Sequence, residues 1–508
     1  MKHLLLQAIN RYAQEQPHKT ALRGVDQSLN YHQLAKRILW LSQSFQDKRI
    51  QRLALHGQNS IDLAVADIAA WCSDIPCIPL PTFFSPQQIS HCVRDSQPDL
   101  ILTDQPDSFA SFMPHTYSEI PLFELNSLTA LRCLSHPRQI PPIPLETCKI
   151  TYTSGTTGEP KGVCLSSQAI EEVMQTLLEA SQGSRNEQHL CLLPLSTLLE
   201  NIGGLYTPLL AGATTHLYPP RHLGMADLRQ INCRVVLETI QRHHITTTIL
   251  VPHLLHVLCA ELSAAHEKSP ATLRFIAVGG AVMPSALLEW AHQLGLPVYE
   301  GYGLSECASV ICLNTPQASR RGSVGKPLPH IRVKLAEDGE VLVKGALFSG
   351  YLGSPITPTS DWWNTGDLGR MDEEGYLYIH GRKKHMFITS QGRNISPEWI
   401  EREFIAHPDI AQIVVFGEGK PWPIALIVPR QGEEPESSRP PLSHTLHTIN
   451  QRLPEYARIR AWLLSPCPLT PSNGMLTTNG RPRRDAIWAY FGDKLAALEP
   501  VDFIHYAA

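Results

Sequence analysis

Four hydroxyl side chains, three glycines and one lysine are gathered in the ten residues from Thr153 to Gly162, TSGTTGEPKG. The segment directly follows a short strand-like run of β-branched and aromatic residues. Glycine lets backbone N–H groups approach an anion closely, the hydroxyls donate further hydrogen bonds, and Lys161 adds positive charge. The spacing is not that of a Walker A loop, and a flexible linker has no reason to follow a strand and end in Pro-Lys-Gly. The segment is therefore predicted to bind phosphate groups.

This segment resembles the phosphate-binding signature of the adenylate-forming superfamily, which includes acyl-CoA synthetases, peptide-synthetase adenylation domains and luciferases. Further motifs of that superfamily follow in the right order. They are VGGA at 278–281, YEGYGLSE at 299–306, NTGDLG at 364–369, GRKKHMFITSQGRNISPEWIE at 381–401 and TTNGRPRR at 477–484. The resemblance covers nearly the whole chain. With LPLSTLLENIGGLYTPLLAGA at 193–213, it points most to long-chain acyl-CoA synthetase-like members.

The resemblance implies that these separated motifs converge on one molecule of ATP. The 153–161 loop would grip the β- and γ-phosphates, Tyr302 would offer an aromatic face to the adenine, and Asp367 would accept the ribose hydroxyls. The nucleotide-binding residues implied in this way are Thr153, Ser154, Gly155, Thr156, Thr157, Lys161, Gly279, Gly280, Ala281, Glu300, Gly301, Tyr302, Gly303, Ser305, Asp367 and Arg382.

Catalysis of this kind consists mostly of positioning and of stabilising negative charge on the phosphates. The resemblance implies that Glu306 is the Mg²⁺ ligand, which fits the preference of Mg²⁺ for one or two carboxylates together with phosphate oxygens. The residues expected to act in catalysis are Arg481, Glu306, Lys161 and Thr153. The acyl and acceptor region is expected to include Thr197, Gly280, Gly303, Lys384, Gln391 and Arg393.

The chain departs from the family pattern near the acyl group. Arg481 stands where relatives have the lysine that bridges the α-phosphate and the acyl carboxylate; arginine stays cationic, but it is larger and planar and does not simply replace lysine. Gln391 stands where relatives commonly have a glycine beside the pantetheine tunnel, which a glutamine side chain could narrow. Thr197 stands where many fatty-acyl relatives have histidine or an aromatic gate. Leu195 replaces the aspartate of amino-acid-activating domains and argues against an α-amino acid, because a buried ammonium needs a partner.

The elements that must position these residues follow from hydrophobic periodicity. Before residue 150, helical spacing at 29–45 and 61–73 alternates with short strand-like runs, and the same rhythm returns between 150 and 312. Such alternation predicts mostly parallel sheets covered on both faces. A β-rich unit is predicted at 322–351, with a hairpin that turns at Asp338-Gly339.

The predicted fold class is therefore α/β. A large N-terminal domain, residues 1–383, is expected to contain two mostly parallel sheets with helices and a small β-barrel-like unit. The resemblance implies that a small, mobile α+β C-terminal domain, residues 384–508, follows a hinge at Lys384. Proline-rich stretches at 134–147 and 429–443 are interpreted as connectors.

The overall composition excludes several classes of protein. The chain has 508 residues, 43% of them hydrophobic and 18% charged, and a formal net charge of −4, which gives no support to a nucleic-acid partner. No window offers the roughly 20 apolar residues of a membrane helix, and the run of three leucines near the N-terminus is too short for the apolar region of a secretory signal. The 12 cysteines form no CxxC pairs and are expected to be reduced. A cytoplasmic enzyme without an integral membrane segment is expected.

The leading hypothesis is an AMP-forming acid–thiol ligase. It would convert a carboxylic acid, fatty or otherwise apolar, to acyl-AMP with ATP and Mg²⁺, and then pass the acyl group to CoA. The first alternative acceptor is the phosphopantetheine of an acyl carrier protein. The second alternative is an adenylate-binding pseudoenzyme, motivated by Arg481 and Gln391.

Overall fold

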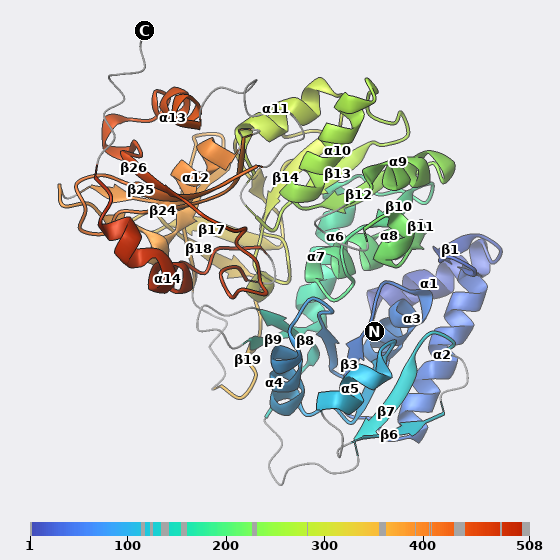
Figure 1. Ribbon diagram of the computed structural model, residues 1–508. Coiled ribbons are helices and arrows are strands. Elements are labelled where there is room, and N and C mark those ends of the chain that lie inside the picture. Colours follow the sequence, from blue (N-terminus) through green and yellow to red (C-terminus); the bar gives the residue numbers. More distant parts are fainter. Residues whose placement is uncertain are drawn as a thin grey trace.

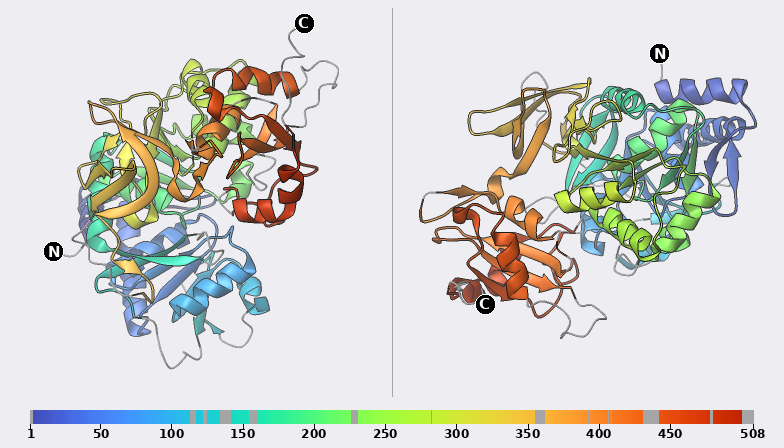
Figure 2. Two further views of the ribbon diagram at one scale, coloured as in Figure 1. Left: turned by 90° about the vertical axis from the view of Figure 1, so that its left-hand side faces the viewer. Right: turned by 90° about the horizontal axis from the view of Figure 1, so that it is seen from above.

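The computed structural model in Figure 1 describes residues 3–112, 117–121, 125–133, 142–153, 160–225, 231–281, 283–354, 362–391, 393–405, 407, 409–430, 442–477 and 480–499. The C-terminal part, coloured orange to red, and the blue N-terminal sheet lie at opposite ends of the molecule (Figures 1 and 2). Among these residues, no helix is both long enough and apolar enough to cross a membrane.

The first sheet has the strand order β19-β9-β8-β4-β3-β5-β7-β6, and it is parallel from β8 to β5. Its strands are β3 (Leu53–His56), β4 (Cys77–Leu80), β5 (Leu100–Thr103), β6 (Tyr117–Ile120), β7 (Thr129–Cys133), β8 (Thr147–Thr153), β9 (Lys161–Ser166) and β19 (Gly350–Tyr351). The strands β3, β4 and β5 are buried along their whole length, as expected for parallel strands covered on both faces. Thr153 pairs with Lys161 across the antiparallel β8–β9 ladder. The predicted phosphate loop therefore connects two neighbouring strands.

The second sheet has the order β16-β15-β14-β13-β12-β10-β11-β1-β2, with parallel strands from β14 to β1 and antiparallel strands at its edges. Its strands are β1 (Thr20–Arg23), β2 (Ser28–Asn30), β10 (Gln188–Cys191), β11 (Thr214–Leu217), β12 (Thr247–Leu250), β13 (Phe275–Val278), β14 (Val298–Tyr302), β15 (Cys312–Leu313) and β16 (Lys326–Pro327). Because β14 ends at Tyr302, the predicted adenine wall lies at the carboxyl end of a parallel strand, where open α/β sheets bind ligands.

Helices flank both sheets, and local capping chemistry sets where some of them begin. Asn30 and Gln33 form a reciprocal capping box at the start of α2 (Tyr31–Asp47), and Ser60 caps α3 (Ile61–Cys72). The other helices before residue 300 are α1 (Leu4–Glu15), α4 (Pro86–Ser96), α5 (Pro106–Phe112), α6 (Ser167–Ala180), α7 (Leu198–Glu200), η1 (Asn201–Tyr206), α8 (Thr207–Ala211), η2 (Pro220–Leu223), α9 (Cys233–Arg242), α10 (Pro252–Ala264) and α11 (Ser285–Gln293).

A small antiparallel sheet forms the predicted β-rich unit. It consists of β17 (Ile331–Leu335), β18 (Glu340–Gly345), β20 (Trp363–Met371) and β21 (Leu377–Arg382), in that order. The expected hairpin joins β17 to β18, and Gly339 has a φ of +82° in its turn. Short 3₁₀ turns, η3 (Ser305–Cys307) and η4 (Lys383–His385), flank this unit in the sequence.

The C-terminal part is built on the three-stranded sheet β24 (Ile410–Phe416), β25 (Ile424–Pro429) and β26 (Ala461–Leu464). Successive residues of β24 enter different cores: Ile413 packs with Phe404, and Val414 packs with Phe491. As a result, α12 (Pro397–Ile405) and α13 (Leu442–Asn450) cover one face, and α14 (Arg484–Ala496) covers the other. The remaining elements are the paired strands β22 (Phe387–Ile388) and β23 (Asn394–Ile395) and the turn η6 (Glu455–Ala457). The predicted α/β class, with two sheets, a small β unit and an α+β C-terminal part, is confirmed.

A buried ion pair ties β8 to its neighbours. Lys149, on β8, is 1% exposed, and its Nζ donates to Asp67 Oδ1 at 2.7 Å, Asn201 Oδ1 at 2.7 Å and the Tyr206 hydroxyl at 2.9 Å. Asn201 and Tyr206 also donate to the second carboxylate oxygen of Asp67. Burial raises the pKa of Asp67, but Lys149 and these hydrogen bonds outweigh it, and the pKa lies below its ordinary value. This network holds the strand that leads into the phosphate loop against α3 and η1.

We expect Lys149→Met to destabilise the protein by about 3–5 kcal/mol, because it leaves the Asp67 carboxylate buried without its counter-charge. Calorimetric unfolding of the full chain measures the change. Lys36→Met, at an exposed position of α2, is the control and should leave the unfolding temperature unchanged. The double variant Lys149→Met/Asp67→Leu should recover part of the loss. Wild-type stability of Lys149→Met would contradict the expectation.

Candidate active site

The centre of the site is a buried carboxylate shared by three strands. Tyr302, the last residue of β14, donates its hydroxyl hydrogen to Asp367 Oδ2 at 2.6 Å. Arg382, the last residue of β21, places Nε 2.8 Å from Asp367 Oδ1. Asp367 is only 4% exposed. Burial raises the pKa of Asp367, and the neighbouring Arg382 and Tyr302 oppose that rise. The structure therefore brings together three of the residues predicted to bind the nucleotide.

Glycines bring two backbone segments close together beside this carboxylate. A Cβ added at Gly303 would lie 1.7 Å from a backbone oxygen, and one at Gly279 would lie 3.2 Å from Gly301 O. Gly280 has a φ of +81°, a conformation that residues with a side chain rarely adopt. Ala281 follows Gly280 at the exposed rim. These contacts explain why the predicted adenine wall contains so many glycines.

The phosphate side of the site contains a cation and a carboxylate. Lys161 Nζ lies 5.8 Å from the centre of the Tyr351 ring, and the Tyr351 hydroxyl donates to Glu306 Oε1 at 2.9 Å. β19, which carries Tyr351, pairs with β9, which carries Lys161. Thr153 ends β8 opposite Lys161. Ser154, Gly155, Thr156 and Thr157 lie outside the described residues.

The C-terminal part supplies a further cation. Arg481 Nη2 donates to the backbone oxygen of Gly280 at 2.9 Å, although 201 positions separate the two residues. Arg481 is bound to Thr477: Thr477 N donates to Arg481 O at 2.7 Å, and Arg481 N donates to Thr477 Oγ1 at 3.0 Å. Arg484 lies three residues further on and is bound within its own domain, with Nη2 2.7 Å from both oxygens of Glu401. The Arg481 guanidinium thus lies against the predicted adenine wall.

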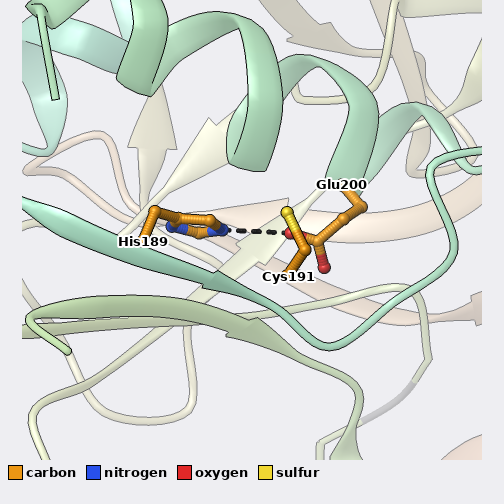
Figure 3. A group of neighbouring side chains, drawn as sticks. All are labelled: His189, Cys191 and Glu200. Atoms are coloured by element: carbon orange, nitrogen blue, oxygen red, sulfur yellow. Dashed lines mark hydrogen bonds and ion pairs between the residues drawn. The ribbon is translucent and has the colours of Figure 1, made fainter. Parts of the chain in front are cut away.

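A buried hydrogen-bonded group holds the segment that carries Thr197 (Figure 3). His189 Nε2 lies 3.0 Å from Glu200 Oε1, and Leu193 N donates to Glu200 Oε2 at 2.8 Å. Cys191 lies beside them and donates to a backbone carbonyl. Histidine, cysteine and glutamate can bind metal ions, but each of the three already has a protein partner here. The group is a structural network that fixes the segment from Leu193 to Glu200.

The residues predicted for the acceptor are not all gathered at the site. Lys384 lies near Arg382 and Arg481, and burial together with these cations lowers its pKa. Gln391 is exposed on the loop between β22 and β23. Arg393 is also exposed, and its guanidinium lies 5.9 Å from the centre of the Tyr456 ring, within the C-terminal part.

Three residues at the site were not singled out in the sequence. Tyr351 holds Glu306, Glu340 accepts a hydrogen bond from Gly366 N, and Glu398 accepts hydrogen bonds from His385 and Ser396. For Glu340 a signal was present, since this carboxylate directly precedes the apolar run Val341–Val343 of the strand. Tyr351 and Glu398 carry no comparable local signal, because their partners are distant or are themselves polar loop residues.

Comparison with known proteins agrees with this geometry. The sequence profile described as AMP-binding enzyme matches residues 9–352, and the one described as AMP-binding enzyme C-terminal domain matches residues 384–498. The chain is 28% identical to indoleacetate–CoA ligase of Aromatoleum aromaticum, over 88% of this chain and 91% of that relative. It is also 28% identical to 2-succinylbenzoate–CoA ligase of Bacillus subtilis, over 81% and 84% of the two chains. Long-chain-fatty-acid–CoA ligase FadD15 of Mycobacterium tuberculosis is 27% identical, over 74% and 72%.

Solved structures share the fold. The anthranilate CoA ligase AuaEII in complex with anthranoyl-AMP aligns with a TM-score of 0.78 and 19% identity, over 96% of both chains. The O-succinylbenzoate Coenzyme A synthetase MenE of Bacillus subtilis, in complex with ATP and magnesium, aligns with a TM-score of 0.75 and 23% identity, over 96% of this chain and 99% of that one. Because the first family profile spans more than half of its length, the chain belongs to the AMP-binding enzyme family of the adenylate-forming superfamily.

Proposed function

We propose that this enzyme activates a carboxylic acid with ATP and transfers the acyl group to the thiol of CoA. In the first step an oxygen of the acid attacks the α-phosphorus of ATP, the bond to the β-phosphate breaks, and pyrophosphate leaves. In the second step the sulfur of the thiol attacks the acyl carbon, a thioester forms, and AMP leaves. The named CoA ligases among its relatives support this proposal.

The observation that carries the proposal is the convergence of Tyr302, Asp367 and Arg382 with Arg481 of the C-terminal part. Asp367 would accept the ribose hydroxyls, and its carboxylate is held in place by the hydrogen bond from Tyr302 and the ion pair with Arg382. Lys161 would offset phosphate charge, and Arg481 would place positive charge between the α-phosphate and the acyl carboxylate. A guanidinium can form forked bonds to both groups.

The residues at the phosphate side fit a bound magnesium ion. Glu306 offers a carboxylate that the Tyr351 hydroxyl holds in place, and Mg²⁺ binds through one or two carboxylates together with phosphate oxygens. When bound, the ion would neutralise charge on the β- and γ-phosphates. Glu306, held by Tyr351, would orient the ion, and Lys161 adds a second positive charge.

The C-terminal domain is proposed to begin at the hinge residue Lys384 and to rotate between the two steps. The C-terminal family profile begins at the same residue, which supports this boundary. In the conformation described here Arg481 donates to Gly280, which suits adenylation, and Gln391 is exposed. Rotation would exchange these two faces, and such a hinge gates the chemistry.

The acid is proposed to be apolar and to lack an ammonium group. The resemblance to long-chain acyl-CoA synthetases favours a fatty or other apolar acid, but relatives of this chain are also named for aromatic acids. Leu195 is buried in the segment that carries Thr197. An apolar side chain there favours an acid without an ammonium group, because a buried ammonium needs a polar partner. The panel in the following test therefore includes medium and long aliphatic acids and aryl acids.

We expect purified enzyme with Mg·ATP and the matching acid to release pyrophosphate. Arg481→Met should lower that rate about 10²–10³-fold, as for the loss of one group that stabilises transition-state charge, and Arg481→Lys should retain activity. Arg483→Met, at the neighbouring exposed arginine, is the control and should stay within about twofold of the wild type. If the wild type binds ATP in calorimetry yet no acid gives pyrophosphate, and Arg481→Lys does not restore turnover, the chain is an adenylate-binding pseudoenzyme instead.

We expect Gln391→Gly to speed thioester formation with CoA about tenfold, since positioning of the attacking thiol limits that step. The rate of acyl-AMP formation should not change. It is measured as pyrophosphate release while hydroxylamine, in place of a thiol, takes the acyl group from the acyl-AMP. Holo-carrier protein, tested in parallel with CoA, identifies the alternative acceptor. An equal rate for Gln391→Gly and wild type with both acceptors would show that this side chain does not narrow the tunnel.

A further inference from the structure

Glu340 is a buried carboxylate outside the reacting groups. It begins β18 directly after the Asp338-Gly339 turn, a place where a charged side chain ordinarily faces solvent, yet it is 5% exposed. A buried carboxylate needs partners. It accepts hydrogen bonds from Lys383 Nζ at 2.8 Å, Asn364 Nδ2 at 3.1 Å and Gly366 N at 3.1 Å. Asp367 and Arg382 form an ion pair that is called the ribose-binding pair below. The hydrogen bonds from Gly366 and Lys383 join Glu340 to the residue before Asp367 and to the residue after Arg382.

The first side is a bulge in β20. The ladder between β18 and β20 runs from Leu342 opposite Asn364 to Glu340 opposite Leu368, so three residues of β20 face one residue of β18. These three residues are Thr365, Gly366 and Asp367, two more than the single residue opposite them, and Gly366 has a φ of +71°. A bulge leaves ladder groups unpaired. The Glu340 carboxylate accepts the N–H of Gly366, one residue before Asp367.

The second side is the end of β21. Asp367 pairs with Arg382 across the β20–β21 ladder. Lys383, the next residue, is half exposed, and its ammonium lies between Glu340 at 2.8 Å and Asp338 Oδ2 at 2.6 Å. Lys384, the proposed hinge residue, follows immediately. Glu340 thus holds the chain one residue before Asp367 and one residue after Arg382.

Electrostatics agree with an ionised carboxylate at this place. Burial raises the pKa of Glu340, but the hydrogen bonds from Lys383, Asn364 and Gly366 N outweigh it, so the pKa lies below its ordinary value. Glu340 therefore stays charged at neutral pH, and its bonds to Lys383 and Gly366 N are both charge-assisted.

We propose that Glu340 is a positioning residue for the nucleotide: it clamps the bulge that presents Asp367 and anchors Lys383, so that hinge rotation begins at Lys384 and leaves the ribose-binding pair in place. This inference rests on the proposed function. Glu340 acts only through Gly366 and Lys383. Its loss therefore weakens binding of the nucleoside and leaves the binding of the acid unchanged.

Calorimetric titration of the full-length enzyme with AMP and with Mg·ATP tests the clamp directly. Glu340→Gln keeps the shape and removes the charge, and we expect it to raise the Kd for AMP about tenfold, the size of one lost charge-assisted hydrogen bond. Asp338→Asn, which contacts the same lysine from the exposed side, is the matched control and should stay within about twofold. The KM for the acid should not change in either variant.

A double-mutant cycle separates a clamp from a general loss of packing. Lys383→Met should also weaken AMP binding, Lys383→Arg should restore it, and the double variant Glu340→Gln/Lys383→Met should bind AMP no more weakly than Glu340→Gln alone. Multiplicative effects of the two single changes, or wild-type affinity of Glu340→Gln, would overturn the inference. If Glu340→Gln does not fold, the two Lys383 variants decide the question by the same titration. Failure of the wild type to bind AMP and ATP at all would instead overturn the proposed function.

Discussion

The buried carboxylate of Asp367 is the interaction on which the site depends. Taking a carboxylate out of water is costly unless hydrogen bonds and charge compensate for it. Here Tyr302 and Arg382 provide both, and they come from the ends of strands in two different sheets. The large sheet and the small antiparallel sheet must therefore be correctly positioned relative to each other before this charge is compensated. A site of this kind exists only when the fold is complete.

Contiguous features of the site could be predicted from the sequence. The glycine segment around Tyr302 and the segment around Asp367 each carry their polar groups within a few residues, so composition and spacing indicate them; the hydroxyl-rich loop stays a prediction, because most of it lies outside the described residues. The alternating strands and helices and the hairpin at Asp338-Gly339 follow from periodicity and turn chemistry in the same way. Sequence reasoning also named Arg481, and the structure brings it to Gly280.

Features that depend on distant pairing could not be predicted in this way. Tyr351 reaches Glu306 only because β19 adds to the edge of the first sheet, and nothing in the local sequence near Tyr351 indicates that pairing. The partners of Glu340 depend on a bulge in another strand, where three residues of β20 face one residue of β18. The buried group of Lys149, Asp67 and Asn201 joins segments far apart in the chain. In each case the role of the residue depends on a side chain or backbone group from a distant part of the sequence.

The internal pairing of Arg484 with Glu401 has a consequence for timing. Arg484, three residues after Arg481, is bound to Glu401 of α12, and Arg481 N donates to Thr477 Oγ1, so the backbone that carries Arg481 is tied to the C-terminal part on both sides. If the C-terminal part rotates as proposed, Arg481 would move together with α12 and α14. A single rotation would then withdraw the Arg481 charge from the acyl-AMP, a mixed anhydride, and at the same time open its carbonyl carbon to the thiol sulfur.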